Sequence, residues 1–167
     1  MLILKTITGS RLYGFAHADS DFDEYIVDTT AKTGQSIVGK SDVVTLHISN
    51  FVQQVGRGVP QAMEALYSPV KWTHPDYTGW FAGMEPDQNE LIRTYRRTIR
   101  HFVLADTDKH RRHAMRLTIN LAEWWNMGSF NPTLYPQDIA EITEYAKSET
   151  LTVAYINDVA PVTIWDQ

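Results

Sequence analysis

The sequence predicts an α+β protein in which a small mixed β-sheet comes first and a helical C-terminal half follows. Short segments rich in β-branched residues dominate the first 48 residues, and helical spacing of apolar residues begins after them. No internal repeat and no linker separates the two parts. We therefore expect residues 1–70 to form a sheet-containing core and residues 71–167 to pack on it as a helical part of a single compact unit.

Three segments have the composition of strands. Residues 2–8 read LILKTIT and end at a Gly-Ser pair, after which a short helical turn is expected. Residues 22–28 read FDEYIVD and alternate well enough for a second strand, and residues 42–48 read DVVTLHI. Residues 29–41, rich in Thr, Gly, Ser and Lys, are predicted to be a loop.

Two long helices are the clearest elements of the second half. One covers residues 86–104, and the other covers 108–127, capped by Asp106 or Asp108 and ended by Gly128.

Shorter helices flank the long pair. A helix capped by Ser49 or Asn50 should be interrupted by glycines before Pro60 starts another, and one more is expected over residues 136–147. The tail, 151–165, has an extended appearance.

Composition excludes several classes of protein. The chain has 167 residues, of which 43% are hydrophobic and 21% charged, as in ordinary globular domains. It has no cysteine, so disulfides, thiolate zinc sites and a cysteine nucleophile are excluded. The first apolar run is too short for a signal peptide, and no stretch could span a bilayer, so we expect a cytoplasmic protein without a membrane partner.

The net charge of −5 is unevenly distributed. Five acids fall within residues 19–28, and eight of the fifteen Lys and Arg residues fall within residues 93–116. An acidic and a basic region in one small domain suit a metal ion bound to a polyphosphate, although two solvated surfaces would look the same.

The chemistry is concentrated in Gly9, Ser10, Asp21 and Asp23. Two carboxylates at positions i and i+2 of a strand point the same way, roughly 6–7 Å apart, and can share hard cations, for which we expect Mg²⁺ with Mn²⁺ as the alternative. A strand that ends in Gly-Ser and turns into a helix exposes backbone N–H groups to phosphate. Together these residues could bind a nucleotide–metal complex, with the triphosphate on the Gly-Ser turn and the metal ion on the two acids.

These residues also carry a resemblance to a known family. The segment GSRLYGFAHADSDFDEYIVD resembles the signature of the DNA polymerase beta superfamily, specifically its branch of small predicted nucleotidyltransferases with G-S-x-x-Y-G … S-D-x-D. DVVTLHISNFVQQVGRGVPQAMEALYSP is similar to that branch's N-P-x-x-x-E-x-L block, with Val59 in place of Asn. KHRRHAMRLTINLAEWWNMG resembles its K-x-x-x-H-x-x-R-L helix, so the likeness covers most of residues 7–147.

The resemblance implies a nucleotidyltransferase core over residues 1–70 and transfer of a nucleoside monophosphate from a nucleoside triphosphate. It implies a third metal-binding carboxylate on the neighbouring strand, for which Asp42 is the candidate, although a turn residue at the strand start fits it equally. Glu64 is the fallback, and a solvated or capping acid describes it better. The catalytic and metal-binding residues are then Asp21, Asp23 and Asp42, and the nucleotide-binding residues are Gly9, Ser10, Arg11, Ser20, Lys109, His113 and Arg116.

The helix from residue 108 carries a polar stripe made of Lys109, His113, Arg116 and Asn120, beside an apolar stripe that should pack inward. Lys109 and Arg116 are expected to neutralise triphosphate oxygens, and His113, placed between these cations, to donate a hydrogen bond rather than a proton. Arg112 lies off this stripe and is expected to be exposed.

A second basic face, formed by Arg93, Arg96, Arg97 and Arg100, is better described as solvated, with RNA or an acidic protein as alternative ligands. The acceptor is left open as an RNA, a protein hydroxyl or a small molecule. The main alternative function is a catalytically silent nucleotide- or RNA-binding module of the same fold, such as a regulatory or antitoxin-like partner.

Overall fold

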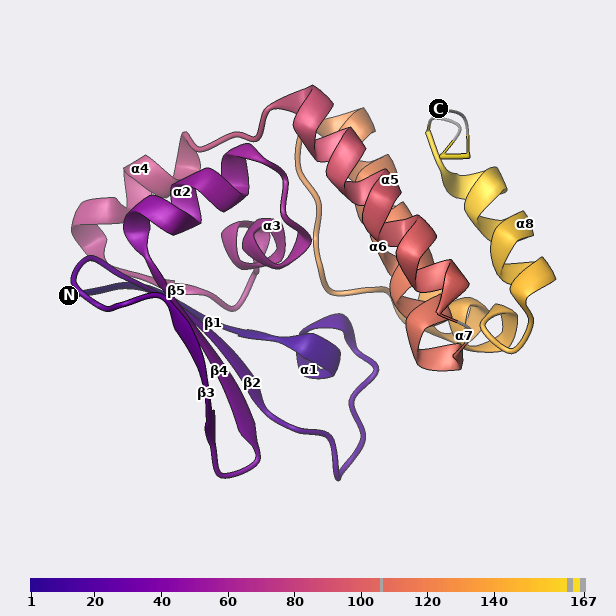
Figure 1. The fold of residues 1–167 in the computed structure, drawn as a ribbon, viewed down its shortest axis with the longest axis horizontal. Coiled ribbons are helices and arrows are strands. Elements are labelled where there is room, and N and C mark those ends of the chain that lie inside the picture. The colour runs from indigo at the N-terminus through magenta and orange to yellow at the C-terminus, as the bar shows by residue number, and fades with distance from the viewer. Residues whose placement is uncertain (106, 162–163, 166–167) are drawn as a thin grey trace.

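The computed structural model describes residues 1–105, 107–161 and 164–165. It has one five-stranded mixed sheet and a larger set of helices, which confirms the α+β class with strands mainly in the first half. Figure 1 shows α2, α3 and α4 beside the sheet, a second group of helices from α5 to α8, and α1 between the sheet and that second group.

The sheet has the strand order β3-β4-β2-β1-β5. Its strands are β1 (Leu2–Thr8), β2 (Asp23–Asp28), β3 (Gly34–Val38), β4 (Ser41–His47) and β5 (Trp72–Thr73). β2 runs antiparallel to β1 and parallel to β4, with Thr8 opposite Asp23 and Glu24 opposite Val43. The end of β1 and the starts of β2 and β4 therefore meet at one end of the sheet.

Two sequence predictions about the sheet are wrong. Residues 34–38 form the edge strand β3 rather than a loop, paired with β4 through a turn at Gly39, whose φ of 67° favours glycine. Every residue of β3 is exposed, so it has no buried face and leaves no alternation in the sequence. β2 begins at Asp23, so Asp21 lies in the preceding loop and does not share a strand face with it.

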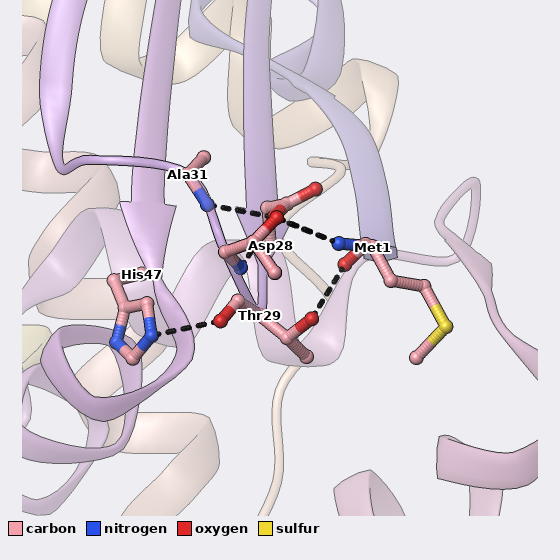
Figure 2. Close-up of polar contacts among 6 residues, drawn as sticks. Met1, Asp28, Thr29, Ala31 and His47 are labelled. Atoms are coloured by element: carbon pink, nitrogen blue, oxygen red, sulfur yellow. Dashed lines mark hydrogen bonds and ion pairs between the residues drawn. The ribbon is translucent and has the colours of Figure 1, made fainter.

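The opposite end of the sheet is closed by hydrogen bonds around Asp28 (Figure 2). Its Oδ1 accepts from the amino group of Met1 and the backbone N–H groups of Thr30 and Ala31, at 3.0, 2.7 and 2.8 Å. These bonds hold the pKa of Asp28 well below its usual range. A ring nitrogen of His47 lies 2.9 Å from the carbonyl oxygen of Thr29, so this histidine joins the end of β4 to the segment after β2.

The helices are α1 (Gly9–Tyr13), α2 (Ile48–Gly56), α3 (Pro60–Tyr67), α4 (Thr78–Ala82), α5 (Gln88–Leu104), α6 (Asp108–Met127), α7 (Pro136–Tyr145) and α8 (Glu149–Val159), with a 3-10 turn, η1, at Pro75–Tyr77. The caps differ from those predicted. His47 rather than Ser49 or Asn50 caps α2, and Thr107 caps α6. The alternative cap, Asp106, lies outside the described residues. Gly128 ends α6 in a left-handed conformation, as predicted.

The extended tail predicted after residue 150 is also wrong where the structure describes it. Residues 149–159 form α8, which the side chain of Ser148 caps. The β-branched residues suggested a strand, but Thr152, Tyr155 and Ile156 are buried at helical spacing, and burial outweighs local propensity. Residues 162–163 of that tail lie outside the described chain.

One continuous hydrophobic core joins the sheet to the helical half. It includes Ile3 and Tyr25 from the sheet, Phe51 from α2, and Leu117 and Leu121 from α6. Among the described residues, no helix combines the length and the apolar character needed to cross a membrane.

Candidate functional site

A pocket of about 390 Å³ lies where the end of β1, the loop before β2 and the first turns of α6 meet. Most of the residues predicted to bind nucleotide or metal are brought together here from positions about 100 residues apart. The pocket is lined by Gly9, Ser10, Tyr13, Phe15, His17, Asp19, Ser20, Asp21, Asp23, Lys109, Arg112 and His113.

The Gly-Ser turn and the acidic pair are in direct contact. Gly9 has a φ of +69°, and a Cβ added there would overlap Oδ2 of Asp23. The pairing of Thr8 with Asp23 across β1 and β2 explains this contact. A glycine is therefore required at position 9 for two reasons, its backbone conformation and the room it leaves for the carboxylate.

Negative charge accumulates around Asp23. Burial raises the pKa of its carboxyl group, and the negative charges of Asp42 and then Asp21 raise it further, while Lys109 lowers it. Asp42, the second residue of the neighbouring strand β4, does not line the pocket. Within the described residues, no three acidic or histidine side chains are grouped closely enough to hold a metal ion together.

The chemistry of these carboxylates fits a magnesium ion for which the protein supplies only part of the ligands. A bound cation would offset the burial and the neighbouring negative charges that together raise the pKa of Asp23. Mg²⁺ is commonly bound through one or two carboxylates together with substrate phosphates and waters, rather than by a complete protein cage. Asp21 and Asp23 supply such a pair at the pocket wall, and Asp42 stays a prediction as a third ligand.

Arg11 does not line the pocket, contrary to what a phosphate-binding role requires. Its guanidinium donates to the backbone carbonyls of Ser20 and Asp21, at 2.7 and 3.2 Å, and lies 5.4 Å from the ring centre of Phe22. Arg11 therefore holds the loop that carries Asp21. Ser20 does line the pocket, where its Oγ accepts from the backbone N–H of His17 at 2.9 Å.

The polar stripe on α6 lies partly at the pocket and partly in the protein core. Lys109 and His113 line the pocket, as predicted, and so does Arg112, which was expected to be exposed and off the stripe. Its guanidinium lies 5.7 Å from the ring centre of Phe15. Arg112 follows Lys109 by three residues, a spacing that puts two side chains on one helix face, so a signal for it was present.

Arg116 lies in the core and not in the pocket, which corrects the phosphate contact expected of it. Its side chain is 4% exposed and its Nη1 donates to Oε1 of Glu64 at 2.6 Å, with Glu64 itself 1% exposed. Its guanidinium also stacks over the ring of Tyr13, 3.6 Å from the ring centre. Glu64 accepts from the hydroxyl of Tyr13 at 2.5 Å, so it is neither a metal ligand nor a solvated or capping acid.

His113 is a neutral side chain in this site. Burial lowers its pKa to about 3, and the charges of Arg116 and Lys109 lower it further. The direction agrees with the sequence argument, but burial and not the neighbouring cations is the larger cause. The ring packs between Tyr13 and Phe102, with ring centres 6.2 and 5.4 Å away. A neutral imidazole here can donate or accept a hydrogen bond but carries no charge to a ligand.

The sequence matches no protein-family model, and a search of curated proteins finds no match either.

Proposed function

We propose that this chain is a metal-dependent nucleotidyltransferase that moves a nucleoside monophosphate from a nucleoside triphosphate to a hydroxyl group. The observation that carries the proposal is the composition of one pocket. A Gly-Ser turn, an acidic pair and the cations of α6 converge on a space of about 390 Å³. The two charge types are those that a triphosphate–metal complex requires, and the resemblance to the polymerase beta superfamily supports the same activity.

The residues divide between phosphate and metal. The hydroxyl of Ser10 would donate to phosphate, while Lys109 and Arg112 would neutralise phosphate oxygens from α6. Asp21 and Asp23 would hold Mg²⁺ or Mn²⁺, which when bound would offset charge on the triphosphate and lower the pKa of the acceptor hydroxyl. The neutral ring of His113 would hydrogen-bond the nucleotide without exchanging a proton.

The chemical step is a displacement at the α-phosphorus. The acceptor oxygen forms a bond to the α-phosphorus. The bond between the α-phosphorus and the oxygen that bridges it to the β-phosphate breaks, and pyrophosphate leaves with that oxygen. The acceptor proton passes to solvent. The pocket residues contribute orientation and charge neutralisation, which supply most of the catalysis in phosphoryl-type transfer.

A silent nucleotide-binding module is the second candidate, and the position of Asp42 favours it. If Asp42 stays outside the pocket when nucleotide binds, the acceptor side of the reaction lacks its third carboxylate. Such a protein would bind the triphosphate through the same residues without releasing pyrophosphate.

The test is to incubate the purified protein with each α-labelled triphosphate, Mg²⁺, and total cellular RNA and protein. We expect label in one acceptor class and stoichiometric pyrophosphate, both lost in Asp23→Asn and kept in Asp76→Asn, an exposed acid on η1. Triphosphate binding without pyrophosphate would support the silent module. An absence of both would reject the proposal.

A further inference from the structure

A second groove, of about 540 Å³, runs along α5 and shares no lining residue with the first pocket. Its lining comprises Arg93, Arg96, Arg97 and Arg100, together with Asn89, Ile92 and Ile164. We call it the arginine groove. Among the residues that the structure describes, no acidic side chain lines it, and its four guanidinium groups gather on a chain whose net charge is −5. The sequence alone favoured a solvated basic face, whereas the structure shows a concave site that two isoleucines help to line.

Most of this positive charge has no ion-pair partner in the described part of the chain. Arg93 bonds both carboxylate oxygens of Glu90, at 2.5 and 2.6 Å. Across residues 1–105, 107–161 and 164–165, no acid forms an ion pair with Arg96, Arg97 or Arg100. Nε of Arg96 is also buried without a hydrogen-bond partner. The groove therefore combines a concave surface with positive charge that has no ion-pair partner among the described residues, which suits an anionic ligand.

The chemistry of the cations favours a nucleic acid over an acidic peptide. All four cations of the groove are arginines, whose planar guanidinium group binds phosphate oxygens in a bidentate manner and also stacks on ring faces. Three of them, at positions 96, 97 and 100, lie within about 6 Å along a helix axis. Single-strand binding sites combine such a positively charged groove with contacts to the bases, whereas an acidic peptide offers carboxylates but no base.

We propose that the arginine groove binds a single-stranded polynucleotide through its phosphodiester backbone. Ile92 and Ile164 also line the groove and offer an apolar surface to the sugars or base edges. The site makes no use of the Gly-Ser turn or the acidic pair, so it does not depend on the nucleotidyltransferase proposal.

Fluorescence anisotropy of a labelled 15-nucleotide oligouridylate, with a thymidylate DNA arm to report on the sugar, tests this directly. Three neutralised phosphates predict a salt slope of about −2, so affinity should fall roughly 20-fold between 50 and 200 mM salt. Changing Arg96, Arg97 and Arg100 together to Ala should weaken binding at least ten-fold at 50 mM salt and flatten that slope. Changing the exposed Lys32, Lys40 and Arg57 to Ala removes the same charge elsewhere and should leave affinity within two-fold.

Circular dichroism checks that the triple variant folds, and the Arg97→Ala/Arg100→Ala double variant repeats the test if it does not. Asp23→Asn should bind the oligonucleotide normally, which separates this site from the first pocket. No binding at 50 mM salt, or equal losses in the groove and control variants, would overturn the proposal. Binding of oligoglutamate but not of polynucleotide would also overturn it.

Self-association that the triple variant abolishes would overturn it as well. That result would indicate that a second copy of the chain occupies the arginine groove. The second copy would contribute its own acidic groove, whose lining includes Glu123, Asp138, Glu141 and Asp158.

Discussion

Replacing Arg116 with Met should destabilise the fold strongly, because it leaves a buried carboxylate without its partner. The side chains of Arg116 and Glu64 are 4% and 1% exposed, and a 2.6 Å bond joins them. Met keeps much of the volume of the aliphatic part of the Arg side chain. The loss of stability therefore measures the effect of removing the charge and not that of creating a cavity. Removing one partner of a buried pair costs about 3–5 kcal/mol in the free energy of unfolding. In a domain of this size that corresponds to a fall in Tm of about 6–20 °C.

Urea unfolding followed by tryptophan fluorescence measures the loss. The matched control is Glu64→Gln/Arg116→Met, which removes both charges and keeps an acceptor for the hydroxyl of Tyr13. We expect the double variant to recover most of the stability, since neutral replacements of buried pairs are often tolerated. If Arg116→Met costs less than about 1 kcal/mol, as an exposed ion pair would, the pair is solvated and Arg116 is available to a ligand after all.

Three further predictions concern the first pocket. Arg112→Ala should weaken triphosphate binding by about 1.5–3 kcal/mol in calorimetric titration, while Arg57→Ala, which removes the same charge from an exposed site, changes it by less than about 1 kcal/mol; equal effects would place the phosphate elsewhere. Asp23→Asn should not lower the stability of the ligand-free protein at pH 7. The pKa of Asp23 is higher in the folded than in the unfolded protein, so at a pH above the unfolded pKa the charged carboxylate destabilises the fold, and its removal costs no stability. The thermal shift that Mg²⁺ with ATP or GTP gives the parent should nevertheless be lost, and a retained shift would remove Asp23 from the metal site. His113, with a pKa of about 3, should stay neutral from pH 5 to 8, so His113→Gln should weaken triphosphate binding without changing its pH profile; an inflection near pH 6.5 present only in the parent would contradict the buried, neutral ring.

The parts of the fold that the sequence predicted are those with strong local signals. Gly128 stops α6 because a left-handed residue is needed there, and glycine adopts that conformation without strain. Gly9 and Asp23 lie at the site because strand pairing fixes their register. By contrast, β3 is exposed on both faces, so no hydrophobic pattern marks it. The helix α8 contains many β-branched residues, which suggest a strand, and the burial of one of its faces outweighs that local preference.

The role of Arg116 could not be predicted for a related reason. Periodicity places Lys109, His113, Arg116 and Asn120 on one face of a helix, but it does not tell whether that face meets solvent, a pocket or the core. The answer depends on Glu64, which lies 52 residues away in sequence. Asn120 is fully buried and Lys109 is exposed, so the stripe passes from the pocket rim into the core within about 17 Å of helix.

Tyr13 is the residue that connects these two environments. Its ring contacts His113 on the pocket side and the guanidinium of Arg116 on the core side, and its hydroxyl donates to Glu64 on α3. The helix α1 begins at the Gly-Ser turn and ends at Tyr13, so the core pair fixes the far end of the element that presents the turn. A loss of triphosphate affinity in an Arg116 variant would therefore arise through Tyr13 and not through a lost phosphate contact. Tyr13→Phe keeps Arg116 and removes only the hydroxyl bond, so a similar loss of affinity in that variant would identify positioning of α1 as the cause.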